Sequence, residues 1–489
     1  MSFDMNIPDH WCWATIAEVQ SNEKRSTITG PFGSSIGKKF FVEHGVPVIR
    51  GNNLSLGSDK FKDEGFVFVS EGKAEELQGY KAFKNDLIFT AAGTIGQVGI
   101  IPEKSKYEFY IISNKQMRAR FDADIVDPMF AYYWFSSPWM VDFIKRHDTG
   151  STIPLINLGV LRALPMPLPP LAEQITIRQY LCTIDDKINN NRNINQTLEQ
   201  MAQALFKSWF VDFEPVKAKM AVLEAGGSQE DATLAAMTAI SGKDADALAV
   251  FEREHPEQYA ELKATAELFP SAMQDSELGE IPAGWESSPL SEKIKLIGGG
   301  TPKRSESEYW NGDICWYSVK DAPAESDVFV IDTTEKITEK GLEKSSTKLL
   351  PIGTTIISAR GTVGKLALTA TEMAMNQSCY GISGGEFSGP LLTYLKVKQC
   401  VDVLKRNTHG AVFDTITTST FETVVTLTAS KLVNRQFEKI VKPFFNAIEN
   451  NLRTNASLTQ LRDTLLPKLL SGEITLPEAE QAVSEAENV

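Results

Sequence analysis

Cysteine and histidine are scarce in this chain of 489 residues, which contains only five of each. The cysteines form no CxxC pair, and no histidine has a Cys or His at metal-ligand spacing. The sequence therefore predicts no metal site and no catalytic histidine. Unpaired cysteines spread along a chain are typical of reduced thiols in the cytoplasm, which is where we expect this protein.

The common motifs of nucleotide and acyl chemistry are also missing. Gly361-Thr362-Val363-Gly364-Lys365 lacks the leading glycine spacing and the final hydroxyl of a P-loop. Gly298-Gly299-Gly300 runs into Thr301-Pro302, where the proline removes an amide that a phosphate site needs. There is no Asn-Pro-Pro-aromatic or Asp-Pro-Pro-aromatic run and no Gly-x-Ser-x-Gly elbow. We therefore predict no catalytic residue and no activity in the chain by itself.

Long apolar runs and an excess of basic residues are absent as well. No stretch approaches the roughly 20 apolar residues of a membrane span, and the polar start 1–10 does not resemble a secretory signal. The net charge is −14. Residues 216–280 hold 13 acids and 5 bases, and residues 473–489 hold 5 acids and no base. The rest is nearly neutral, so a basic face for an anionic partner remains compatible with the composition.

The chain contains an internal duplication. An Ile-Pro-x-x-Trp start, a glycine turn and a long amphipathic stretch each occur twice, roughly 260 to 275 residues apart. Short β-type runs bounded by turn residues precede each amphipathic stretch. The copies are Ile7-Pro8-Asp9-His10-Trp11 and Ile281-Pro282-Ala283-Gly284-Trp285, Ala91–Gly96 and Ala359–Gly364, and 172–210 and 434–471.

The two amphipathic stretches match position by position at a constant offset of 260 residues. Their apolar residues alternate four and three apart, which is the spacing of a coiled-coil seam. A two-fold relation between the copies would make the helices antiparallel and place Asn191 opposite Asn451, unless these asparagines simply face solvent. The matched positions are Ile177, Leu181, Ile184, Ile188, Asn191, Asn195, Leu198, Met201 and Leu205 in the first helix, and Phe437, Val441, Phe444, Ile448, Asn451, Asn455, Leu458, Leu461 and Leu465 in the second.

The predicted fold class is α+β: two globular mixed α/β domains in tandem, separated by two long antiparallel coiled-coil helices with pseudo-two-fold symmetry. Leu164–Pro170 is too rich in proline for a helix interior and predicts an extended strap. The predicted segments are a first domain (1–163), the strap with the first long helix (164–214), an acidic helical connector (215–280), a second domain (281–430), the second long helix ending near Gly472 (431–472) and a frayed acidic tail (473–489).

Basic and amide side chains gather at predicted loops of both domains. Arg and Lys can bind guanine, Asn and Gln can bind adenine, and glycine turns can meet phosphates, so these residues are candidates for contact with duplex DNA. Each of them alone could equally be a solvated surface residue, and the glycines could serve only a tight turn. The candidates are Lys24, Arg25, Lys38, Lys39, Arg50, Asn52, Asn53, Thr94 and Gln97 in the first domain, and Lys303, Arg304, Lys320, Arg360, Thr362 and Lys365 in the second.

Six further segments carry a resemblance to a known family. Their order and their duplication resemble the specificity subunit of type I restriction-modification enzymes over essentially the whole chain. Two departures are the long acidic connector and Val425–Ala429, which stands where the first copy has its proline strap. The segments are Ile281–Trp285, Gly299–Pro302, Tyr309–Gly312, Ser358–Gly364, Pro167–Gln174 and Leu205–Phe213.

The resemblance implies two target recognition domains that read the two halves of an asymmetric, interrupted site in double-stranded DNA. It implies that the long helices set the gap and dock two methyltransferase subunits, and that restriction/translocase subunits join them. S-adenosylmethionine, ATP and Mg would then belong to the partner subunits, with no cofactor in this chain. The alternative is a protein-binding scaffold whose partners make the DNA contacts.

Overall fold

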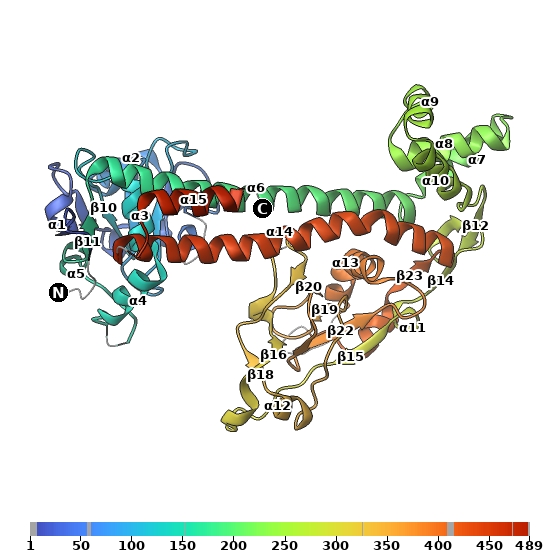
Figure 1. Cartoon of the computed structure of the whole chain (residues 1–489). Coiled ribbons are helices and arrows are strands. Elements are labelled where there is room, and N and C mark those ends of the chain that lie inside the picture. The colour runs from blue at the N-terminus through green and yellow to red at the C-terminus, as the bar shows by residue number, and fades with distance from the viewer. Residues whose placement is uncertain are drawn as a thin grey trace. The chain divides into compact units, whose positions relative to one another are not determined.

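The computed structural model describes residues 7–55, 60–150, 152–324, 326–407, 415–471 and 473–487 (Figure 1). The chain divides into two compact units, each of which we describe by itself. The first unit comprises Met1–Asn189 and Asn455–Val489, and the second comprises Asn190–Thr454. The long helices are α6 (Leu171–Phe210) and α14 (Lys431–Ser471). One part of each helix belongs to the first unit and the other part to the second.

Short strands of the first unit form three sheets. In the second sheet β7 pairs with both β8 and β10, and in the third β4 lies parallel to β9. The sheets are β1 (Cys12–Thr15) with β11 (Pro165–Leu168); β2 (Thr27–Thr29), β10 (Gln116–Ala119), β7 (Leu87–Thr90) and β8 (Val98–Ile100); and β3 (Phe41–Val42), β5 (Val67–Val69), β4 (Val46–Ile49), β9 (Tyr110–Ile112) and β6 (Lys81–Ala82).

The aromatic helix α3 (Pro128–Ser136) packs against the second sheet of this unit. In α3 six consecutive residues, from Phe130 to Phe135, are buried. Proline at the first helical position and an N-cap aspartate, Asp127, start this helix. The remaining helices are α1 (Ile16–Val19), α2 (Glu71–Glu76), α4 (Pro138–Arg146) and α5 (Leu158–Arg162).

The predicted proline strap forms the edge strand β11. In an antiparallel pair, alternate residues direct their amides toward the partner strand, so prolines at positions 165 and 167 remove only amides that point away from β1. The carbonyl of Pro165 on that outer side accepts a hydrogen bond from the Trp134 indole at 2.8 Å. Val425–Thr428 forms the equivalent strand β23 and pairs with β14 (Glu286–Pro289), so the entries to the two long helices are closely equivalent despite their different sequences.

In the second unit a helical connector follows α6 (Figure 1). Ala236, Met237, Leu248 and Ala266 form a small core of their own. Gly242 at a φ of 68° ends one helix, as its sequence position predicts. The connector contains α7 (Glu214–Glu224), α8 (Gln229–Ser241), α9 (Ala245–Glu254) and α10 (Pro256–Glu267), followed by the hairpin β12 (Met273–Ser276) and β13 (Gly279–Pro282).

The second globular domain has two further sheets and a long helix, α13 (Pro390–Arg406). The five-stranded sheet has the order β15 (Lys295–Gly298), β22 (Cys379–Ser383), β19 (Thr355–Ser358), β20 (Leu366–Thr369) and β17 (Phe329–Val330). The three-stranded sheet has the order β18 (Lys336–Ile337), β16 (Trp310–Tyr317) and β21 (Met373–Met375). Short helices α11 (Leu290–Lys293) and α12 (Glu339–Glu343) complete the domain.

The two domains share a core strand topology, although their sheets differ in the number of strands. The order β2-β10-β7-β8 of the first corresponds to β15-β22-β19-β20 of the second, and the parallel pair β4–β9 corresponds to β16–β21. The register also agrees, because Thr90 is opposite Gln116 as Ser358 is opposite Cys379. The duplication seen in the sequence is therefore a duplication of the fold.

Within each unit, α6 packs against α14 through buried apolar residues. In the first unit Ile177, Leu181, Ile184 and Ile188 share a core with Leu458. In the second unit the partners of Phe437 are Phe206, Trp209 and Phe210, with ring centroids 5.1–6.1 Å apart. The predicted seam residues Val441 and Ile448 are fully buried there, and Leu198 is partly buried.

The helices of the second unit run antiparallel, but their register differs from the predicted one. Asn451 donates to Asn195 at 2.8 Å, whereas the sequence predicted Asn191 as its partner, one helical turn earlier. The pairs Asn195–Asn451 and Phe206–Phe437 show that residue numbers fall along α14 as they rise along α6. Asn191 is 4% exposed, so it does not face solvent.

Three further expectations are corrected by the packing. Met201 is 47% exposed, and Ala202 takes the buried position beside it. Phe445 is 1% exposed, whereas the predicted Phe444 is only partly buried. The acidic tail is not frayed where it is described: it forms α15 (Leu476–Glu487), whose Ala479 and Val483 pack into the core of the first unit. Gly472, the predicted stop of α14, lies outside the described residues.

Candidate nucleic-acid interface

An open groove in the first domain collects four of the predicted DNA-binding residues. Arg50, Asn52, Thr94 and Gln97 line it together with Lys115, Gln116 and backbone of the glycine turn. They meet because β4 and β7 end at this place and β10 begins there, so the loops after β4 and β7 lie beside the loop before β10. The groove thus presents cationic, amide and hydroxyl groups on one surface.

Two side chains of the groove hold unused hydrogen-bonding capacity. The Arg50 Nε and Gln116 Nε2 atoms are buried and have no partner among the described residues. Gln116 is 1% exposed, and its Oε1 atom accepts from Ser113. Gln97 is held by Thr90 at 3.1 Å and by the Leu54 carbonyl at 3.3 Å. Unsatisfied buried donors cost free energy. Because both atoms are closed to solvent, a ligand in the groove would bind them only after the side chains shift.

Asn53 corrects one site prediction. It is fully buried, and its amide is used by the backbone: Oδ1 accepts from the Arg50 amide at 3.0 Å, and Nδ2 donates to the carbonyls of Lys62 and Glu64 at 3.1 and 2.9 Å. Asn53 therefore shapes the 3-10 turn Gly51–Asn53 and does not reach a ligand. Its neighbour Asn52 is exposed and donates to the Gly65 carbonyl at 3.2 Å.

The second domain builds the same turn from different residues. Asp321 takes the place of Asn53 and accepts from the Ser318 amide at 2.8 Å, so Ser318 corresponds to Arg50 and Lys320 corresponds to Asn52. Burial raises the pKa of Asp321, but hydrogen bonds from Thr334 and Ser318 outweigh it and hold the pKa below its usual range. The scaffold is thus retained while the exposed side chain changes from amide to ammonium.

The glycine turns are equivalent in the same way. Gly93, Gly96, Gly361 and Gly364 have φ values of 100°, 91°, 77° and 83°, which confirms the tight turn that the sequence indicated. Each turn carries one exposed threonine, either Thr94 or Thr362. Matching backbone hydrogen bonds flank the turns: Thr90 to Gln97 and Ser358 to Lys365, then Ala91 to Lys115 and Ala359 to Ser378.

These matches pair every groove position of the first domain with one of the second. Gln97 corresponds to Lys365, Lys115 to Ser378, Gln116 to Cys379 and Ala92 to the exposed Arg360. Most of these pairs differ in charge or hydrogen-bonding capacity. The two domains therefore offer different chemistry on one scaffold.

Other predicted residues lie outside the groove or already have partners. Lys24, Lys38 and Lys39 are exposed, and the Lys39 ammonium lies 4.8 Å from the Phe40 ring centroid. Arg25 lines a neighbouring hollow with Arg162. In the second domain Lys303 pairs with Glu306 at 3.0 Å.

Arg304 is the most strongly engaged of the predicted cations. Its guanidinium forms a two-point contact with Glu335 and lies 3.9 Å from the Trp310 ring centroid. The contact with Glu335 raises the pKa of Arg304, and Arg304 lowers the pKa of Glu335. A DNA phosphate would have to displace this carboxylate.

Lys115 and Gln116 were missed by the sequence reasoning, although a signal was present. Asn376 and Gln377 are two further amide side chains that follow the basic residues of the second domain in the sequence. Their counterparts in the first domain are Ser113 and Asn114, directly before Lys115. Aligning this loop between the two copies would have identified it.

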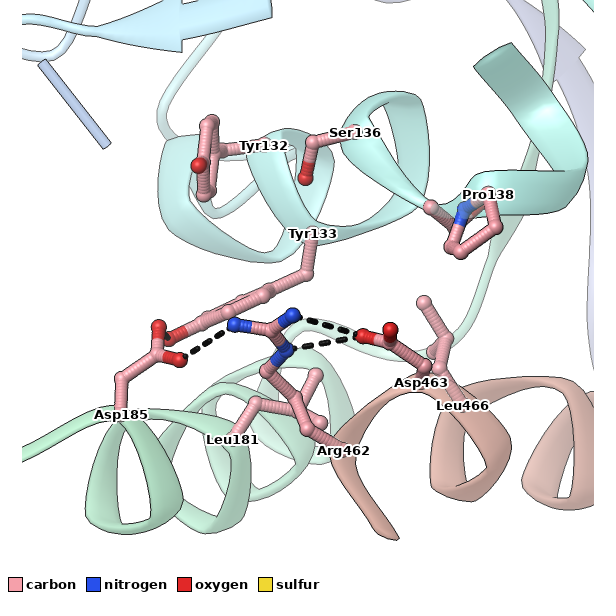
Figure 2. A pocket seen from close by; sticks show the side chains of 10 residues that line it. Tyr132, Tyr133, Ser136, Pro138, Leu181, Asp185, Arg462, Asp463 and Leu466 are labelled. Carbon is pink, nitrogen blue, oxygen red and sulfur yellow. Dashed lines mark hydrogen bonds and ion pairs between the residues drawn. The ribbon is translucent and has the colours of Figure 1, made fainter. Parts of the chain in front are cut away.

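A buried ion network joins α6, α14 and α3 within the first unit (Figure 2). Asp185 accepts from Tyr133 at 2.6 Å, Arg462 at 3.0 Å and Lys60 at 3.1 Å, and Arg462 also binds Asp463 at 2.8 Å. The Asp185 side chain is 3% exposed. Burial, reinforced by Asp185, raises the pKa of Tyr133 far above its usual range, so its hydroxyl remains a donor.

The described part of the chain has neither a metal-ligand cluster nor a membrane-spanning helix. It contains no group of His, Cys, Asp and Glu side chains that could hold a metal ion, and His409 lies outside it. Within the same residues, no helix combines the length and apolar character needed to cross a membrane.

Comparisons with known proteins agree with this architecture. The family model described as "Type I restriction modification DNA specificity domain" matches residues 33–200 and 282–460. The type I restriction enzyme HindI specificity subunit of Haemophilus influenzae is 36% identical over 375 residues, which are 75% of this chain and 81% of that protein. The MjaIX specificity subunit of Methanocaldococcus jannaschii is 25% identical and covers 84% of each chain.

Among solved structures, a type I restriction-modification system S subunit from M. genitalium aligns with a TM-score of 0.46 and 16% identity, over 96% of this chain and 98% of that chain. The family model covers more than half of the sequence in two blocks, one per copy of the duplication. The chain therefore belongs to the specificity subunits of type I restriction-modification systems.

Proposed function

We propose that this chain is a non-catalytic subunit that reads a bipartite, asymmetric site in double-stranded DNA with one groove per domain. The observation that carries the proposal is the groove of the first domain together with the equivalent positions of the second, where a common scaffold presents different polar side chains. A shared scaffold suits the duplex that both domains would bind. Different side chains suit two different half-sites.

The chemistry of the polar residues that line the groove fits base edges. Arg50 can bind guanine at two points, and Asn52 or Gln97 can bind adenine. At the equivalent places the second domain has Ser318, Lys320 and Lys365, so its half-site should differ in base composition.

We further propose that α6 and α14 dock two methyltransferase subunits and fix the gap between the half-sites. Within the second unit, Ile194 and Met201 on α6 are 41% and 47% exposed, and a spacing of seven residues places them on one helix face. Exposed apolar side chains in such a row are suited to a protein partner.

The remaining chemistry is assigned to partners of this cytoplasmic complex. S-adenosylmethionine would be bound by the methyltransferase subunits, and ATP and Mg by restriction/translocase subunits. Family membership supports this division, since the relatives that match most of this chain are named as specificity subunits. The proposal includes no membrane partner.

Footprinting of the complex with its methyltransferase subunits tests the two-groove arrangement. Two short protected blocks separated by an unread gap are expected. One continuous protected block would contradict it. Replacing residues 1–163 by the first domain of another family member should change one half of the recognised sequence and leave the other unchanged.

A second candidate function is a scaffold whose partners make all DNA contacts. The carboxylate partners of Lys303 and Arg304 favour it, because these cations are already neutralised. Charge reversal at Arg360 and Lys365, with reversal at Lys38 and Lys39 as the counterpart in the first domain, separates the two. If the subunit reads DNA, the charge-reversed variants still assemble with their partners, but the complex binds DNA more weakly and with a smaller salt dependence. If the subunit is only a scaffold, the DNA affinity and the salt dependence of the complex stay unchanged.

A further inference from the structure

Beside each glycine turn lies a helix end whose sequence is also duplicated. α4 ends in Val141-Asp142-Phe143-Ile144-Lys145-Arg146, and α13 ends in Val401-Asp402-Val403-Leu404-Lys405-Arg406. Both helices terminate directly after the arginine. Neither basic pair was singled out by the sequence reasoning.

The helix end and the turn are in contact in both domains. A Cβ atom placed on Gly96 would lie 2.9 Å from Val141 Cγ1 and 3.7 Å from Lys145 Cε. A Cβ atom on Gly364 would lie 3.1 Å from Val401 Cγ1 and 3.3 Å from Lys405 Nζ. The lysine side chain therefore lies against the turn that presents the exposed threonine.

The internal duplication separates two kinds of residue around the groove. At the base-reading positions the domains differ, as in Arg50 against Ser318 or Gln97 against Lys365. At the turn and helix end they are identical in glycine, threonine, lysine and arginine. Two half-sites differ in their bases but share the same phosphate backbone, so the identical residues suit the shared ligand.

From this contrast, and resting on the proposed DNA-reading function, we infer that each turn and its helix end form a phosphate clamp on the DNA backbone of its own half-site. The clamp consists of Thr94, Lys145 and Arg146 in the first domain and of Thr362, Lys405 and Arg406 in the second. The ammonium and guanidinium supply charge, and the threonine hydroxyl supplies a neutral donor. The clamp positions the domain and does not read sequence.

Local charges are compatible with this assignment. Arg146 pairs with Asp142 at 3.3 Å, but both side chains are more than 60% exposed, so a phosphate can replace the carboxylate at little cost. Basic residues in a last helical turn also stabilise the helix through its dipole. That structural role would affect folding and would not affect the salt dependence of DNA binding.

The test uses the chain assembled with its methyltransferase subunits and two duplexes, one with the site identified by methylome sequencing and one scrambled. K145Q/R146Q should reduce the slope of log affinity against log salt by about 2, with K405Q/R406Q doing the same. The affinity for both duplexes should fall by the same factor, so the preference for the site duplex over the scrambled duplex stays unchanged. K145R/R146K, which keeps the charges, should retain the wild-type slope.

K84Q/K104Q is the matched control, because it removes two exposed lysines beside the opposite end of the β7–β8 hairpin. An unchanged slope in this control, together with the losses above, supports the clamp. A clamp variant that matches the control, changes the site preference, or fails to fold or assemble overturns it. If the wild-type complex shows no preference for the site duplex, the proposed function itself fails.

Discussion

Removing the Asp185 carboxylate should strongly destabilise the first unit. Asp185 is 3% exposed and faces Arg462 and the Tyr133 hydroxyl (Figure 2), and it also pairs with Lys60 at 3.1 Å. D185N leaves two cations without their common anion, and breaking a buried pair in this way costs about 3–5 kcal/mol. R462M should cost less, about 2 kcal/mol, because Asp185 keeps Lys60 and Tyr133 as partners.

The assay is thermal unfolding of the whole chain, with the transition of the first unit followed separately. A loss of about 4 kcal/mol lowers the Tm of a unit of this size by roughly 8–16 °C. The double variant D185N/R462M should cost less than the two single variants together, because the second substitution removes one of the two cations that lose Asp185.

E76Q provides the control in the same unit. It breaks the Lys73–Glu76 pair, whose carboxylate is 67% exposed, and should cost less than about 0.5 kcal/mol. Equal small effects of D185N and E76Q, or additive effects of D185N and R462M, would refute the reasoning that the buried network stabilises the α6–α14 contact.

Three further outcomes are expected. R50A should weaken DNA binding by about 1–3 kcal/mol and relax the sequence specificity at one base position, whereas N53A should lower the free energy of unfolding. The reverse pattern in binding and melting assays would contradict the groove assignment. G96A should destabilise more than G93A in chemical denaturation, because both have positive φ but only Gly96 is crowded. Burial lowers the pKa of Lys396 to about 8, so the unfolded chain binds more protons above that pH. The free energy of unfolding should therefore rise between about pH 8 and 10.5, and K396M should abolish the rise.

The fold was predictable where a repeated pattern defines it. The 260-residue offset and the apolar spacing predicted both long helices, since burial of one stripe dominates such elements. The register was predicted one turn wrong, because the midpoint of the matched seam gave Asn191 as the partner of Asn451 in place of Asn195. Apolar spacing alone did not distinguish Phe444 from Phe445, since both neighbours are large and aromatic.

The groove was predictable only in part. Arg50 and Asn52 come from one loop and Thr94 and Gln97 from another, and residue type alone suggested them without showing that they meet. Residue type failed for Asn53, because an exposed and a backbone-bound asparagine look alike in sequence. The role of Asn53 is decided by its hydrogen bonds to the carbonyls of Lys62 and Glu64, which only the folded chain brings close to it.

Methylome sequencing of a host with and without this chain tests the central claim most directly. The account predicts that one methylated motif disappears with the chain and that this motif consists of two different specified blocks around a fixed unread gap. An unchanged methylome, or a lost motif that is continuous, would contradict it.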